Sequence, residues 1–146
     1  MYSSDFEKFE PKAYIELSKK LYENLDDYKT SEALYSAVKR TIVDRLYYAG
    51  FLTFRNFIEE YYNYPPDTVK MEHAENLIEK GNFFKNWDNK KVYDYFYILR
   101  RNRAQCDFYF KNPNTENNLL GWSKKSIEDL FIITDHLIEL IEKYKE

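Results

Sequence analysis

Residues 30–66 read TSEALYSAVKRTIVDRLYYAGFLTFRNFIEEYYNYPP, and Gly50 is the only helix breaker before the Pro65–Pro66 pair. Thr30 or Ser31 is suited to cap a helix that begins here, because a hydroxyl accepts hydrogen bonds from free backbone N–H groups. At about 1.5 Å per residue this helix would reach ~50 Å. Apolar residues follow two stripes along it: Val43, Tyr47, Gly50, Phe54, Phe57, Ile58 and Tyr61 on one side, and Leu34, Val38, Tyr48 and Leu52 on the other. A helix that is apolar on two sides needs cover on both, so we expect it at the centre of the fold.

Helical patterns also precede and follow this segment. Pro11 is a suitable first helical residue, and the spacing predicts a helix over Lys12 to Asp27. Asp67 to Lys80 predicts a weaker helix, ended by Gly81–Asn82 in a left-handed cap.

After a polar break at Asn86 to Asn89, the pattern predicts a fourth helix from about Lys90 to Phe110. Lys111 to Gly121 reads as a loop, and Ser123 as the cap of a last helix running almost to the end. The prediction is an all-α, up-and-down bundle of four to five helices forming one domain over residues 1–146.

Composition supports a packed helical protein and excludes several classes. Of 146 residues, 44% are hydrophobic and 32% charged, and a net charge of −3 argues against a surface coated in positive charge. Cys106 is the only cysteine, so no disulfide forms within the chain and no structural zinc site is expected. Residues 1–11 are acidic and lack an apolar run, and no run of about 18 apolar residues occurs, so we expect a cytoplasmic protein that is neither secreted nor inserted in a membrane. No cofactor motif is found.

Two arginines interrupt apolar stripes. Arg103 continues the stripe through Leu99 toward Cys106, and Arg45 lies on the second stripe of the long helix. A buried guanidinium stays charged and needs fixed acceptors. Asp107, one turn after Arg103, is the nearest candidate, since Asp44 points about 100° away from Arg45.

One carboxylate facing two arginines would leave positive charge for a phosphate, framed by Tyr48 and by Tyr47. The alternative is an ordinary surface pair of Arg103 with Asp107, and an Arg45 whose stem is buried and whose head is in water.

At these residues the sequence resembles the HEPN family, the higher eukaryotes and prokaryotes nucleotide-binding domain. Residues 45–51, RLYYAGF, resemble the family's Arg-x-Tyr-Tyr-Ala-x-Phe signature in its long second helix. Leu99 followed by residues 103–108, RAQCDF, is close to its Leu-x3-Arg-x2-Ala-Asp-Tyr pattern in the fourth helix. His73 lies where small free-standing prokaryotic members often carry a histidine.

The resemblance implies a homodimeric bundle whose second and fourth helices line a polar cleft, with roles linked to nucleotides or RNA. Many members are metal-independent ribonucleases that use an arginine, often followed by asparagine, with a histidine four to six residues on. Here Arg101–Asn102 is present, but Cys106 and Asp107 stand where that histidine would stand. Neither a thiol nor a carboxylate replaces imidazole as a proton carrier near pH 7 without a large change in acidity.

The resulting hypothesis is a non-catalytic, homodimeric module that binds a nucleotide or RNA, with a minimal nucleotidyltransferase partner in a toxin–antitoxin-like system implied by the resemblance. The expected ligand-binding residues are Arg45, Tyr48, Arg103 and Asp107, with Tyr47, His73, Arg101 and Asn102 as secondary candidates. Two alternatives remain: a divergent ribonuclease toxin acting through Arg101, Asn102 and Arg103, and a purely structural dimerisation module.

Overall fold

The computed structural model describes residues 10–66, 68–111 and 123–145, with the backbone alone for residues 107–111. Its described residues form five α-helices and two short 3₁₀ helices, so the predicted all-α class is confirmed. The α-helices are α2 (Pro11–Glu23), α3 (Glu32–Tyr61), α4 (Ala74–Gly81), α5 (Asn86–Lys111) and α7 (Lys124–Glu142), and the 3₁₀ helices are η1 (Leu25–Tyr28) and η2 (Met71–His73).

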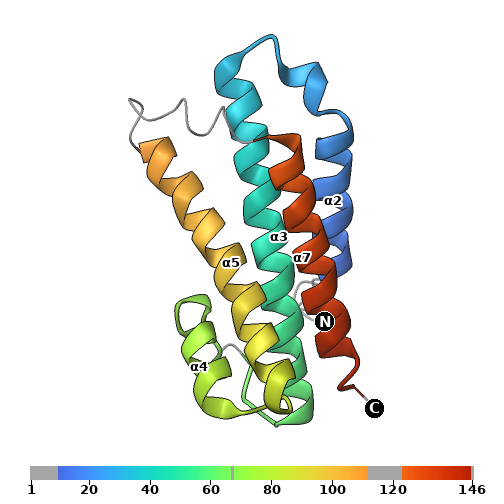
Figure 1. The fold of residues 1–146 in the computed structure, drawn as a ribbon, viewed down its shortest axis with the longest axis vertical. Coiled ribbons are helices and arrows are strands. Elements are labelled where there is room, and N and C mark those ends of the chain that lie inside the picture. Colours follow the sequence, from blue (N-terminus) through green and yellow to red (C-terminus); the bar gives the residue numbers. More distant parts are fainter. Residues whose placement is uncertain (1–9, 67, 112–122, 146) are drawn as a thin grey trace, which may run out of the picture.

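The four long helices run along the long axis of the molecule in alternating directions, and α4 lies beside the first half of α5 (Figure 1). Helix α3 packs against α2, α5 and α7, so its predicted central position is confirmed. Both of its apolar stripes are used, because α2 covers one side while α5 and α7 cover the other.

Helices α5 and α7 meet the middle of α3 in the core. Phe54 is fully buried and its ring lies edge-on to that of Phe96, 6.3 Å between centroids. Gly50 allows the close approach, since a Cβ atom there would lie 2.9 Å from Leu137 Cδ2 and 3.3 Å from Leu99 Cδ1. The stripes end before the helix does, because Leu34 and Tyr61 near its two ends are exposed.

Three predicted helix ends are confirmed by their capping geometry. The Ser31 hydroxyl accepts from the Leu34 N–H at 3.2 Å, and the Ser123 hydroxyl accepts from the Ser126 N–H at 3.1 Å. Asn82 closes α4 in the left-handed conformation, with φ of 49°.

Other predicted boundaries are wrong by up to two turns. Helix α2 stops at Glu23, and the turn expected to continue it to Asp27 is the 3₁₀ helix η1. The helix predicted from Asp67 begins only with η2 at Met71 and continues as α4.

The predicted polar break at Asn86 to Asn89 is instead the first turn of α5. Its polar side chains have partners elsewhere: Asn89 donates to the Ile78 carbonyl at 3.1 Å, and Asp88 accepts from the Tyr144 hydroxyl at 2.5 Å. Lys111, predicted to open a loop, ends α5, and the rest of that predicted loop lies outside the described residues.

No helix in the described part of the chain is both long and apolar enough to span a membrane.

Candidate functional site

Helix α3 presents two polar faces at neighbouring positions. Successive helical residues are rotated by about 100°, so Asp44 and Tyr47 share one face while Arg45 and Tyr48 share the next. The first face meets Arg103 of α5, and the second meets Tyr14 of α2. Each face therefore has its own arginine.

Arg103 lies against three side chains from two elements. Its Nε is 3.2 Å from Asp44 Oδ1, and its guanidinium lies 5.1 Å from the centroid of the Tyr47 ring. Its Nη1 approaches the sulfur of Met71 in η2 at 3.6 Å. The paired atoms of Arg103 and Asp44 are buried, although the whole side chains are 34% and 27% exposed. They form an ion pair without the alignment of a hydrogen bond.

Tyr47 closes the inner side of this pair. Its ring is buried and packs edge-on against Phe96, with centroids 5.4 Å apart. Burial raises the pKa of Tyr47, and the positive charge of Arg103 partly offsets this rise. Tyr47 is therefore a neutral platform for the guanidinium.

The other arginines of α5 have different surroundings. Arg100 forms an ion pair with Glu75 of α4, and its guanidinium lies 5.3 Å from the centroid of the Tyr97 ring. Arg101 is exposed and forms no ion pair with any described residue. The Asn102 amide donates to the Ile98 carbonyl at 2.8 Å, one turn back on the same helix.

Arg45 lies in an aromatic layer between α2 and α3. Its guanidinium is 5.8 Å from the centroid of the Tyr14 ring, and that ring is 5.2 Å from the ring of Tyr48. Tyr48 stacks in turn on Phe51, with centroids 6.4 Å apart. Arg45 is half-buried and pairs with no described carboxylate.

The expected set is therefore divided between two places. Arg45 and Tyr48 lie together on the α2 side, while Arg103 and Tyr47 lie together on the α5 side. The carboxylate found at Arg103 is Asp44, which the sequence analysis judged a poorer partner, because its 100° offset from Arg45 turns it toward α5. The Asp107 side chain lies outside the described part of the chain.

The sequence also singled out His73 and Cys106, of which one lies at the surface and the other in the core. His73 is exposed at the end of η2, with its Nε2 3.7 Å from Glu72 Oε1. Cys106 is a buried thiol inside the bundle. Within residues 10–66, 68–111 and 123–145, no three His, Cys, Asp or Glu side chains gather as a metal site would require.

A hollow of about 480 Å³ lies between α4 and α5 beside Arg100. Glu72, Glu75 and Glu79 line it, so its walls are acidic. The outer surface of α5 beyond it carries what we call the α5 ridge: Tyr97, Arg100 and Arg101. The sequence analysis did not include Tyr97, although its spacing of three and four residues from the two arginines places all three on one side of a helix.

No protein-family model, curated protein or solved structure matches this chain. Its function must therefore be argued from its own residues.

Proposed function

We propose that this chain is a non-catalytic, HEPN-like module that binds RNA or a nucleotide through the α5 ridge. The proposal depends on a guanidinium that has no counter-charge among the described residues and that follows an exposed aromatic residue by one helical turn. Arg101 is exposed and unpaired among the described residues, and Tyr97, one turn earlier, is 37% exposed.

The chemistry of the ridge fits single-stranded RNA. A base stacks on an exposed aromatic ring for about 1–3 kcal/mol, and an arginine guanidinium binds phosphate through two parallel hydrogen bonds. The Arg100 guanidinium lies near the Tyr97 ring, so the ridge offers a base a second flat surface beside that ring. Because the chain carries a net charge of −3, binding depends on this local positive charge and should weaken with salt.

Arg103 has a positioning role in this proposal. Its charge is matched by Asp44, and its guanidinium is held between Tyr47 and Met71. This arrangement fixes α5 against α3 and η2, so that Arg101 and Tyr97 project from a rigid helix. Asp107 and the Arg45–Tyr48 pair are not needed for the ridge.

The absence of catalysis is proposed from the surroundings of Arg101 and Asn102. Cys106, one of the two residues standing where the family's histidine would be, is fully buried and has no access to a substrate. The Asn102 amide is engaged by its own helix. The homodimer and the nucleotidyltransferase partner of a toxin–antitoxin-like system rest on the HEPN resemblance alone.

Fluorescence anisotropy with a short, 5′-labelled single-stranded RNA tests the ridge. We expect Tyr97→Ala/Arg101→Ala to weaken binding by about tenfold or more, since the loss of one stacked base and one phosphate contact exceeds about 1.4 kcal/mol. Lys125→Ala is the matched control, because it removes an exposed charge from α7 and should leave the affinity nearly unchanged. Equal weakening by the control, or no binding by the wild type, would overturn the proposal.

The same RNA tests the absence of catalysis. Incubation with excess wild-type protein should leave the RNA intact on a denaturing gel. Cleavage that disappears in Arg103→Ala would replace the binding module with a divergent ribonuclease.

A further inference from the structure

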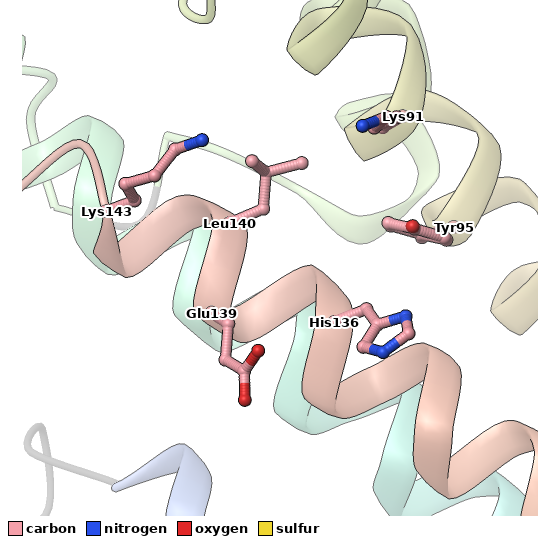
Figure 2. A pocket seen from close by; sticks show the side chains of 6 residues that line it. All are labelled: Lys91, Tyr95, His136, Glu139, Leu140 and Lys143. Carbon is pink, nitrogen blue, oxygen red and sulfur yellow. The ribbon is translucent and has the colours of Figure 1, made fainter.

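A separate groove runs between the first half of α5 and the last turns of α7. It encloses about 260 Å³ and is lined by Lys91, Tyr95, His136, Glu139, Leu140 and Lys143 (Figure 2). None of these residues belongs to the α5 ridge or to the cluster around Arg103.

Two lysines line the groove, one on α5 and one directly after the end of α7. Lys91 of α5 and Lys143, the residue after α7, extend toward one another, whereas the carboxylate of Glu139 points away (Figure 2). Lys91 forms no ion pair with any described residue. Lys143 is paired with Asp88, and the charge of Lys91 also acts on that carboxylate, so the positive charge of the groove comes from Lys91 and from a Lys143 that turns away from Asp88.

Lys143 can turn into the groove at little cost. Its Nζ is 3.5 Å from Asp88 Oδ2, but the lysine side chain is mostly exposed, and such exposed pairs contribute little to stability. Asp88 keeps another partner when Lys143 leaves, because the Tyr144 hydroxyl donates to the same oxygen at 2.5 Å. That hydrogen bond is the main reason why the pKa of Asp88 lies below its usual value. Asp88 thus stays a satisfied carboxylate without the lysine.

Flat and apolar surfaces lie next to the amines. The rings of Tyr95 and His136 are 6.1 Å apart and tilted by 57°, and they form one end of the groove (Figure 2). Leu140 points into the space between them and Lys143 (Figure 2). An aromatic ring beside two amines suits a ligand that combines a planar base with a phosphate.

We propose that this groove binds a nucleoside 5′-monophosphate, with the phosphate between Lys91 and Lys143 and the base against Tyr95 and Leu140. The phosphate can belong to a free mononucleotide or to the 5′ end of an RNA strand. The inference goes beyond the proposed function, because it uses none of the ridge residues and holds even if the ridge binds nothing.

Isothermal titration with adenosine 5′-monophosphate tests the groove directly. We expect Lys91→Ala/Lys143→Ala to weaken binding by about tenfold or more, and Asp88→Asn to tighten it, because the amide still accepts from Tyr144 but no longer attracts Lys143. Tyr95→Leu should weaken binding of the nucleotide while leaving that of inorganic phosphate unchanged. Lys125→Ala on α7 is the matched charge control and should bind as the wild type does. Circular dichroism establishes that each variant is folded.

Three comparisons make the outcome decisive. Tighter binding of 5′-phosphorylated than of 5′-hydroxyl RNA would assign the phosphate to a strand end, and binding of the mononucleotide alone would assign it to the free form. Tyr97→Ala/Arg101→Ala should keep its affinity for the mononucleotide, which separates the groove from the ridge. No binding of either phosphate form, or undiminished mononucleotide binding by the double lysine variant, would overturn the proposal.

Discussion

Asp44 and Arg45 are neighbours in α3, but one faces α5 and the other faces α2. On the α5 side, Arg103 meets a carboxylate, a buried tyrosine and a thioether. On the α2 side, Arg45 meets the ring of Tyr14 and no described carboxylate. A guanidinium with buried atoms thus lies beside its own counter-charge, whereas one between two helices lined with aromatic rings needs only a flat surface.

The largest expected effect is the removal of the counter-charge. Asp44→Ala leaves the buried Nε of Arg103 without its carboxylate, and we expect it to lower the free energy of unfolding by about 2–3 kcal/mol. This is less than for a fully buried pair, because both side chains are partly exposed. Urea denaturation measures the change.

The double variant Asp44→Ala/Arg103→Met serves as the control for this effect. Its loss of unfolding free energy should be at least about 1 kcal/mol smaller than the summed losses of Asp44→Ala and Arg103→Met, because the pair is removed as a unit. Strictly additive losses would mean that the two side chains do not interact.

Substitution of Tyr47 should have the second-largest effect on stability. Tyr47→Leu removes the buried ring under Arg103 and its edge contact with Phe96, so we expect a loss of about 1–2 kcal/mol. Tyr47→Phe keeps the ring and should cost less than about 1 kcal/mol. Thermal unfolding compares the two, and equal losses would assign the effect to the hydroxyl instead of the ring.

Substitution of Arg45 should lower the stability by less than either of these changes. Arg45→Ala removes a half-exposed cation–π contact with Tyr14, for which we expect about 0.5–1 kcal/mol. Tyr14→Leu combined with Arg45→Ala should show a coupling of similar size in a double-mutant cycle. A loss in Arg45→Ala as large as in Asp44→Ala would erase the difference between the two faces.

The smallest effect belongs to an exposed ion pair that joins η1 to α7. Lys124 Nζ donates a hydrogen bond to Asp26 Oδ2 at 3.0 Å, and this bond lowers the pKa of Asp26. A hydrogen bond with Lys29 lowers that pKa further. Because the folded pKa lies below the unfolded one, the contribution to stability is present above the unfolded value of about 4 and is lost as the pH falls through the folded value. Melting temperatures of wild type and Asp26→Asn should therefore differ slightly at pH 7 and converge at low pH. A difference that grows at low pH would contradict this sign.

The sequence was sufficient to predict the helices because their signals are local. The two apolar stripes of α3 predicted its central position. Ser31 and Ser123 predicted the starts of α3 and α7, and Asn82 predicted the end of α4. The start of α5 was missed because Asp88 and Asn89 look like a polar break until Tyr144 and Ile78 are seen as their partners. Such long-range contacts are not encoded in helical spacing.

The candidate site was only partly predictable for a related reason. The sequence identified Arg45 and Arg103 as departures from their stripes, but helical spacing does not say which neighbouring helix each stripe meets. It therefore placed the two arginines in one pocket, whereas α3 presents them to different helices. The sequence did not connect Tyr97 with Arg101, because an exposed residue on the outer side of a helix interrupts no apolar stripe.

Ultraviolet crosslinking of the wild-type protein to single-stranded RNA, followed by mass spectrometry of the crosslinked peptides, shows which helices of the bundle contact RNA. Tyr14 and Tyr48 lie beside Arg45 between α2 and α3, while Tyr97 precedes Arg101 by one turn on α5, so the crosslinked tyrosine identifies the helices that bind. We expect a crosslink at Tyr97 that is lost in Arg101→Ala. A crosslink at Tyr14 or Tyr48, with none at Tyr97, would contradict it.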